Sequence, residues 1–254
     1  MSSDFEALFH ENALFGLDAM ISLSEFQGEG PFEIDLSTGF LIVEDKKASI
    51  SAVGTWAGPP TSSWLWSWAN PGWKTLPSSV ISAGEVLKKL GEERGIASFT
   101  ASEIPTLPDK ADEIGFHLTA IAAGLTGAAG ALQYKHDRGS AFFLVQTLSS
   151  GTSDHMSRHM RVITEGLQNY TLPHRLAITS YLKQKRYEID DSAKDRLIAL
   201  RDNDKVEITF DALDRLANIS GSMASQQDIA QLDAAEAAKP AKSRTGFFSK
   251  LFKK

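Results

Sequence analysis

The sequence predicts an α+β fold: an antiparallel meander sheet covered by helices, followed by a smaller α+β unit and a flexible C-terminal tail. Three observations carry this prediction. Apolar residues recur at helical intervals near the N-terminus, and short apolar segments separated by turn residues follow them. The tryptophans Trp64, Trp66 and Trp68 are then spaced two residues apart. Side chains of a strand alternate between its faces, so this spacing places the three indoles on one face of a strand.

The first region begins with a helix that we expect from about Asp4 to Ser24. Ser3 and Glu6 have the spacing of a capping box, and apolar residues follow at every third or fourth position. Four short strands joined by short turns then predict the meander. These strands are expected at residues 32–36, 40–43, 49–56 and 63–70, the last being the tryptophan segment.

Further helices and a hairpin complete the first region. Helices are expected at residues 80–94 and 109–127, a short strand at 99–101, and hairpin strands at 131–134 and 141–147. Gly95 follows the first of these helices and is a suitable C-cap, because glycine adopts the left-handed conformation without strain. Residues 136–139 form the expected hairpin turn.

A polar segment, Ser149–Ser153, marks the expected boundary of the first domain. The predicted organisation is an α+β domain at 1–150, a small helical and β-strand unit at 151–221, and a linker with a basic tail at 222–254. In the second unit we expect helices at 154–169 and 171–182 and strands at 197–200, 206–210 and 215–219.

The composition is that of an ordinary soluble protein, with 42% hydrophobic and 23% charged residues among 254. The absence of cysteine excludes disulfides, thiol nucleophiles and cysteine-ligated metal sites. The N-terminus lacks the pattern of a secretory signal. The longest uncharged apolar run, Leu118–Leu132, is too short and glycine-rich to span a bilayer. We therefore expect a cytoplasmic protein, with peripheral attachment at the inner membrane as an option.

The net charge of −6 is unevenly distributed. From Lys239 to the end there are six Lys/Arg residues and no acids, whereas the preceding 238 residues carry 20 basic and 32 acidic side chains. An acidic body argues against nucleic acid as a partner. On a helix, four apolar residues of the tail share one face beside lysines; this docking segment comprises Phe247, Phe248, Lys250, Leu251, Phe252 and Lys253. The pattern predicts docking on an anionic membrane surface or on a partner protein.

The segment Trp64–Pro71 reads W-x-W-x-W-A-N-P. It resembles an element of a bacterial family of uncharacterised cytoplasmic proteins. Gly54-Thr55-Trp56, the helix Phe116–Ala122 and Tyr134 match that family in order. The resemblance covers roughly residues 5–148. It implies an α+β domain of unknown function and supplies neither catalytic residues nor a cofactor.

The tryptophan row has two interpretations. In the first, the indoles pack in the core, which is the commoner role of regular aromatic rows. In the second, Trp64, Trp66 and Trp68 line a ligand groove, while the alternate residues Leu65, Ser67 and Ala69 face the interior. The Asn70 side chain is a further candidate for ligand binding, although asparagine often closes its own turn.

Three histidines are candidates for chemical roles. His117 lies on the expected 109–127 helix. It either contacts a ligand at the edge of a pocket or is a buried side chain with its hydrogen bonds made. His155 and His159 have a spacing that can bind one metal ion, but the His-Glu-x-x-His motif is absent and no third ligand is evident. We therefore expect surface or capping histidines there, no metal and no cofactor.

The missing catalytic motifs favour a non-enzymatic binding or scaffold protein, with an aromatic groove and a C-terminal docking tail. The alternative is an enzyme whose pocket lies between the tryptophan strand and the 109–127 helix, with His117 as the acid–base group.

Overall fold

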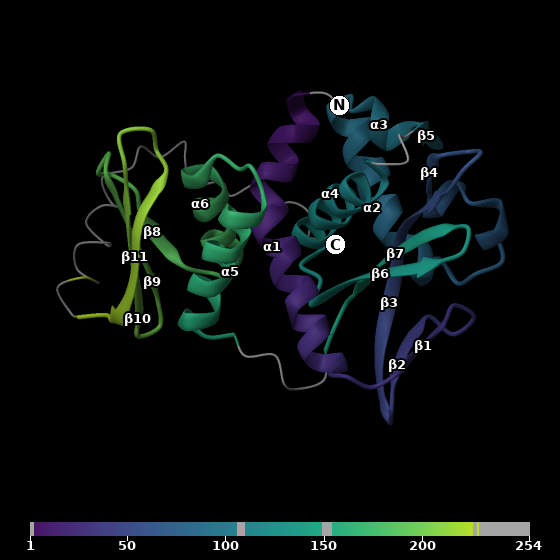
Figure 1. The fold of residues 1–254 in the computed structure, drawn as a ribbon, viewed down its shortest axis with the longest axis horizontal. Coiled ribbons are helices and arrows are strands. Elements are labelled where there is room, and N and C mark those ends of the chain that lie inside the picture. The colour runs from purple at the N-terminus through teal and green to yellow at the C-terminus, as the bar shows by residue number, and fades with distance from the viewer. Residues whose placement is uncertain (1–2, 106–109, 149–153, 226–227, 229–254) are drawn as a thin grey trace.

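The computed structural model describes residues 3–105, 110–148, 154–225 and 228 (Figure 1). The helices are α1 (Ser3–Gln27), α2 (Ser78–Arg94), α3 (Ala97–Thr100), α4 (Ala111–Thr126), α5 (Met156–Asn169) and α6 (His174–Gln184), with 3-10 turns η1 (Ser67–Ala69) and η2 (Pro71–Trp73). The strands of the first sheet are β1 (Phe32–Asp35), β2 (Phe40–Val43), β3 (Lys46–Ala57), β4 (Ser63–Trp66), β5 (Glu103–Pro105), β6 (Gly130–His136) and β7 (Gly139–Val145). Those of the second are β8 (Glu188–Asp190), β9 (Arg196–Arg201), β10 (Asp204–Phe210) and β11 (Leu216–Met223).

The first sheet is antiparallel and is organised around the long strand β3. On one side, β3 pairs first with β2 and then with β4; on the other side, it pairs with β7, which carries β6. The order β1-β2-β3-β4-β5 confirms the predicted meander. The α+β fold is confirmed as well.

Trp64 and Trp66 form the centre of the core between this sheet and its helices. They project together from β4, with ring centroids 5.5 Å apart, and neither exposes any surface. Trp64 contacts Phe142 of β7, while the Trp66 indole N–H donates to the carbonyl of Ser98 at 3.1 Å. The spacing of two therefore predicted the strand and the shared face of these two indoles.

The strand prediction is wrong beyond Trp66, because η1 begins at Ser67 and turns the chain. The Ser67 hydroxyl donates to the carbonyl of Ile81 in α2 at 3.0 Å, a contact with a distant segment that local spacing does not reveal. The expected strand at 99–101 is also wrong. Helix α3 occupies 97–100, and the strand β5 follows it at 103–105.

Helix α1 lies between the two halves of the molecule (Figure 1). It contacts α4 and β6 of the first half and α5 and α6 of the second. One hydrophobic core runs across it, since Leu14 of α1, Val162 of α5, Ile178 of α6 and Leu118 of α4 belong to the same buried cluster. The second half is therefore attached through shared core as well as through the chain.

The four strands of the second sheet are antiparallel in the order β11-β10-β9-β8. Helices α5 and α6 cover the face that bears Val206 and Ile208. Both helices and three of the four strands were predicted; β8 was not. The docking segment Phe247–Lys253 lies outside the described residues.

Among residues 3–105, 110–148 and 154–225, no helix combines the length and apolarity that crossing a bilayer requires.

Candidate functional site

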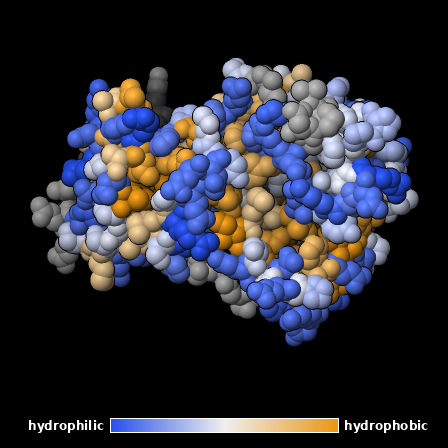
Figure 2. Space-filling view, viewed as in Figure 1, coloured by the Kyte–Doolittle hydropathy of each residue, from blue (hydrophilic) through white to orange (hydrophobic). Residues whose placement is uncertain are grey.

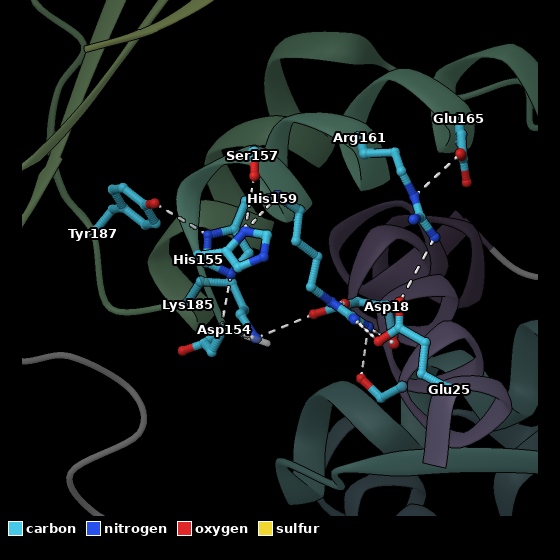
Figure 3. Close-up of polar contacts among 12 residues, drawn as sticks. Asp18, Glu25, Asp154, His155, Ser157, His159, Arg161, Glu165, Lys185 and Tyr187 are labelled. Atoms are coloured by element: carbon cyan, nitrogen blue, oxygen red, sulfur yellow. Dashed lines mark hydrogen bonds and ion pairs between the residues drawn. The ribbon is translucent and has the colours of Figure 1, made fainter. Parts of the chain in front are cut away.

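A buried ion pair joins α1 to α5. Asp18 of α1 and Arg158 of α5 are each only 4% exposed, and Arg158 Nε donates to Asp18 Oδ1 at 2.7 Å (Figure 3). The guanidinium also donates to the Asp18 carbonyl at 3.1 Å, to the Ser22 hydroxyl at 2.7 Å and to the Glu25 carboxylate. Burial opposes the charged form of Arg158, but Asp18 and Glu25 outweigh it and raise its pKa. A buried cation with four hydrogen bonds to α1 is thus held between the two halves.

The ion pair continues into the end of α6. Lys185 Nζ lies 3.1 Å from Asp18 Oδ2 and 2.7 Å from Asp154 Oδ1, so it links the two carboxylates (Figure 3). Asp154 also receives Arg201 Nη1 at 3.0 Å. Burial alone would raise the pKa of Asp154, but the hydrogen bond and charge of Lys185 outweigh it and hold that pKa well below its usual range.

His159 is completely buried within this network. Its Nε2 lies 2.8 Å from Asp154 Oδ1 and its Nδ1 lies 3.1 Å from the Tyr187 hydroxyl. Burial lowers the pKa of His159, against the opposing effect of Asp154. His155 instead caps α5, because its Nδ1 accepts the Arg158 backbone N–H. The expectation of surface or capping histidines is confirmed for His155, which caps α5. It is wrong for His159, which is completely buried and bonded to Asp154 and Tyr187.

A cleft of about 1040 Å³ opens beside this network, where the C-terminal ends of α4 and α6 approach α1. Its apolar wall consists of Leu8 and Phe15 of α1 and Leu125 of α4. Cationic and acidic side chains complete the lining: Arg94, Lys183, Lys185 and Arg186, with Glu11 and Asp154. The volume is that of a pocket for a drug-sized ligand or a short segment of chain.

Polar groups at the base of the cleft are fixed by α1. Asn12 is buried; its Nδ2 donates to the Leu8 carbonyl at 2.7 Å, and its Oδ1 accepts Gln184 Nε2 at 2.8 Å. Gly124 makes this possible, since a side chain there would occupy the place of the Asn12 amide. Gln184 Oε1 is buried and accepts no hydrogen bond from the described residues. An acceptor without a donor is costly, so this oxygen is a source of strain at the base of the cleft.

The tryptophan groove is a wrong prediction for Trp64 and Trp66, because both indoles are entirely buried and the core interpretation holds. Trp68 is half-buried against the core and lies under the Lys88 ammonium, 4.6 Å from its ring centroid. Asn70 Oδ1 accepts the Gly72 N–H at 2.9 Å and closes its own turn. The structure does not bring these side chains together around an opening.

His117 is a partly buried side chain whose ring stacks on Phe9 with centroids 3.6 Å apart. Burial lowers its pKa to about 4, with Glu113 opposing. The Glu113 carboxylate, the nearest candidate for a catalytic partner, pairs with Lys110 at 2.7 Å. Within the described residues, no three His, Asp or Glu side chains group closely enough to hold a metal ion.

The sequence did not predict the charged junction, the network of Asp18, Arg158, Lys185 and Asp154 between the two halves. The Asp18 and Arg158 side chains meet across 140 residues of sequence, and no motif connects them. One local signal was present, since Asn12 and Asp18 lie on the buried side of α1, among its apolar residues. A polar side chain on the apolar face of a helix usually has a specific partner.

One comparison with known proteins gave a match. The model of a family of unknown function, DUF6882, matches residues 6–148. No curated protein and no solved structure matches the chain.

Replacing Arg158 with alanine is expected to lower the free energy of unfolding by about 3–5 kcal/mol, because it leaves the Asp18 carboxylate buried with less compensation. Arg161→Ala is the matched control on the same helix. Arg161 is half exposed and pairs at the surface, so its loss should cost about 1 kcal/mol or less. Urea denaturation measures both, and equal effects would contradict a structural role for the buried pair.

The titration of His117 is expected to weaken the fold in mild acid. Its pKa in the folded chain is about 4 and its ordinary value is 6.5, so the unfolded chain binds the proton first as pH falls. The stabilisation is complete above pH 6.5 and is lost as pH falls towards 4. His117→Phe keeps a ring on Phe9 and removes the proton. Denaturation at several pH values should show a smaller loss of stability in this variant, and an unchanged pH profile would refute the assignment.

Proposed function

Because the chain belongs to DUF6882, a family of unknown function, we propose from the site itself that the protein is a non-enzymatic binding protein. Its junction cleft receives an acidic, partly apolar peptide segment of a partner. The observation that carries this proposal is the cleft lining, in which four cations and two carboxylates surround an apolar wall.

The charges of the cleft favour an anionic ligand. Asp154 is already engaged by Lys185 and Arg201, so its negative charge is largely compensated. Among the described residues, no ion pair involves Lys183 or Arg186, and both side chains are exposed at the cleft. Carboxylates of a ligand would form charge-assisted hydrogen bonds with these two side chains.

The remaining groups favour a peptide over a simple anion. The C-terminal turns of α4 and α6 line the cleft, and the last carbonyls of a helix have no donor within it, so they can accept backbone N–H groups of a ligand. An apolar side chain of the ligand would cover Leu8 and Phe15. A segment with acidic and apolar residues provides all three kinds of contact.

The enzyme alternative has less support. The space between β4 and α4 is filled by packed rings, including Trp64, whose centroid lies 5.2 Å from that of Phe142. His117 stacks on Phe9 within that packing, and its neighbouring carboxylate is paired with Lys110. Within the part of the chain that the structure describes, this packing and pairing therefore give the acid–base hypothesis little support.

A fluorescein-labelled peptide of alternating glutamate and leucine provides a direct test. Its fluorescence polarisation should show saturable binding that weakens with added salt. The double variant Lys183→Glu with Arg186→Glu should weaken binding at least about tenfold, since it replaces two attractive charges with repulsive ones. The same peptide with lysine in place of glutamate should not bind.

The matched control is Lys47→Glu with Lys74→Glu, which makes the same change of charge at exposed lysines outside the cleft. This control should bind the acidic peptide as the unchanged chain does. Equal losses in both double variants would show a non-specific charge effect, and no saturable binding by the unchanged chain would overturn the proposal.

We propose further that the docking segment Phe247–Lys253 attaches the protein to an anionic membrane surface or to a partner. The support comes from the sequence, where apolar residues on one helical face adjoin lysines. Deleting residues 246–254 should leave thermal unfolding unchanged and abolish sedimentation with vesicles containing phosphatidylglycerol. Phe248→Ser with Phe252→Ser keeps the charges and should also weaken binding. Equal sedimentation of all forms would remove the membrane version.

A further inference from the structure

Strand β11 is a long outer edge of the second sheet. Among the described residues it pairs with β10 alone, in a register that runs from Asp204↔Met223 to Thr209↔Asn218 before a bulge. It spans eight residues, and most of its side chains are exposed, with Met223 79% exposed. Half of its backbone hydrogen-bonding groups therefore point away from β10.

The edge lacks the features that usually prevent strand pairing. Residues Leu216–Met223 include no charged residue and no proline, whereas edge strands are commonly blunted by lysine or proline. The outward face carries Asn218, Ser220 and Ser222, which can form hydrogen bonds across a strand pair. The chemistry of this edge permits an additional strand.

An apolar strip of α5 runs beside the same edge. A Cβ at Gly221 would lie 2.7 Å from Met156 Sδ and 3.1 Å from Met160 Cε, so both methionines lie directly over this part of β11. Both methionines and Ile219 are only partly buried. Figure 2 shows hydrophobic surface on the visible face in the region of β11 and α5. A strand added here would bury apolar side chains in addition to satisfying backbone groups.

We propose that β11 pairs antiparallel with β11 of a second copy of this chain, about a two-fold axis through Ser220. The two four-stranded sheets then form one continuous eight-stranded sheet, with both α5 helices on the same face. This isologous contact is closed, so it yields a dimer.

The side chains of β11 favour this occupant. Residues directly opposite in an antiparallel pair share a face, so the axis has to pass through a residue. An axis at Ser220 places Ile219 opposite Gly221 of the second copy, on the face where Met156 and Met160 lie over that glycine, so the Ile219 side chain would meet these methionines. It places Asn218 opposite Ser222 and Ser220 opposite itself. Because β11 has no charged residue, pairing it with itself brings no like charges together.

Sedimentation velocity of the full chain over a range of concentrations tests the proposal, and a dimer is expected. Ser220→Lys brings two ammonium groups together at the axis and should raise the dissociation constant at least about tenfold. Thr209→Lys, on the adjacent inner strand, is the matched control and should remain dimeric. An equimolar mixture of the Ser220→Lys and Ser220→Glu chains should form heterodimers, because opposite charges then meet.

A cross-link provides a second measurement that does not depend on weakening the dimer. The chain has no cysteine, so Ser220→Cys introduces the only thiol. Mild oxidation should convert this variant to a disulfide-linked dimer, whereas Thr209→Cys should form the non-covalent dimer with little disulfide cross-linking. The proposal is overturned if the chain is monomeric at all concentrations or if Ser220→Lys leaves the dimer unchanged. It is also overturned if this edge binds only an extended peptide of another protein.

Discussion

The buried guanidinium of Arg158 determines how the two halves of the molecule are joined. A cation out of contact with water has to be matched by fixed acceptors, and here Asp18, Glu25 and Ser22 of α1 supply them. Apolar packing around Leu14 also joins the two halves, but hydrophobic burial is not directional. The hydrogen bonds of Arg158 to α1 are directional, so they fix the position of α5 and of the second sheet packed on it.

The cleft is a consequence of the same junction. Its apolar wall belongs to α1 and α4, within the region that the family model covers, whereas Lys183, Gln184 and Arg186 follow that region. Lys185 belongs both to the cleft, which it lines, and to the buried ion pair, where it contacts Asp18. The cleft is therefore complete only when both halves are docked, and the family region alone contains one part of it.

Local patterns in the sequence predicted local structure. The spacing of Trp64 and Trp66 predicted a strand with both indoles on one face, and Gly95 was correctly placed as a left-handed C-cap. The turn at Ser67 was not predictable, because it depends on a hydrogen bond to α2. The network around Asp18 was missed for the same reason, since its partners Arg158 and Lys185 are distant in the sequence. Sequence periodicity reports burial, but it does not identify the distant partner of a buried polar group.

The central claim is that α1 and the second half form one cooperative unit through this ion pair. Native-state hydrogen exchange of the full chain in increasing guanidinium, read by mass spectrometry, tests it most directly. The account predicts that the amides of α1, α5 and α6 become exposed together, with the same free energy of opening and the same dependence on denaturant. A separate opening of α5 to β11 at lower free energy, while α1 stays protected, would contradict it.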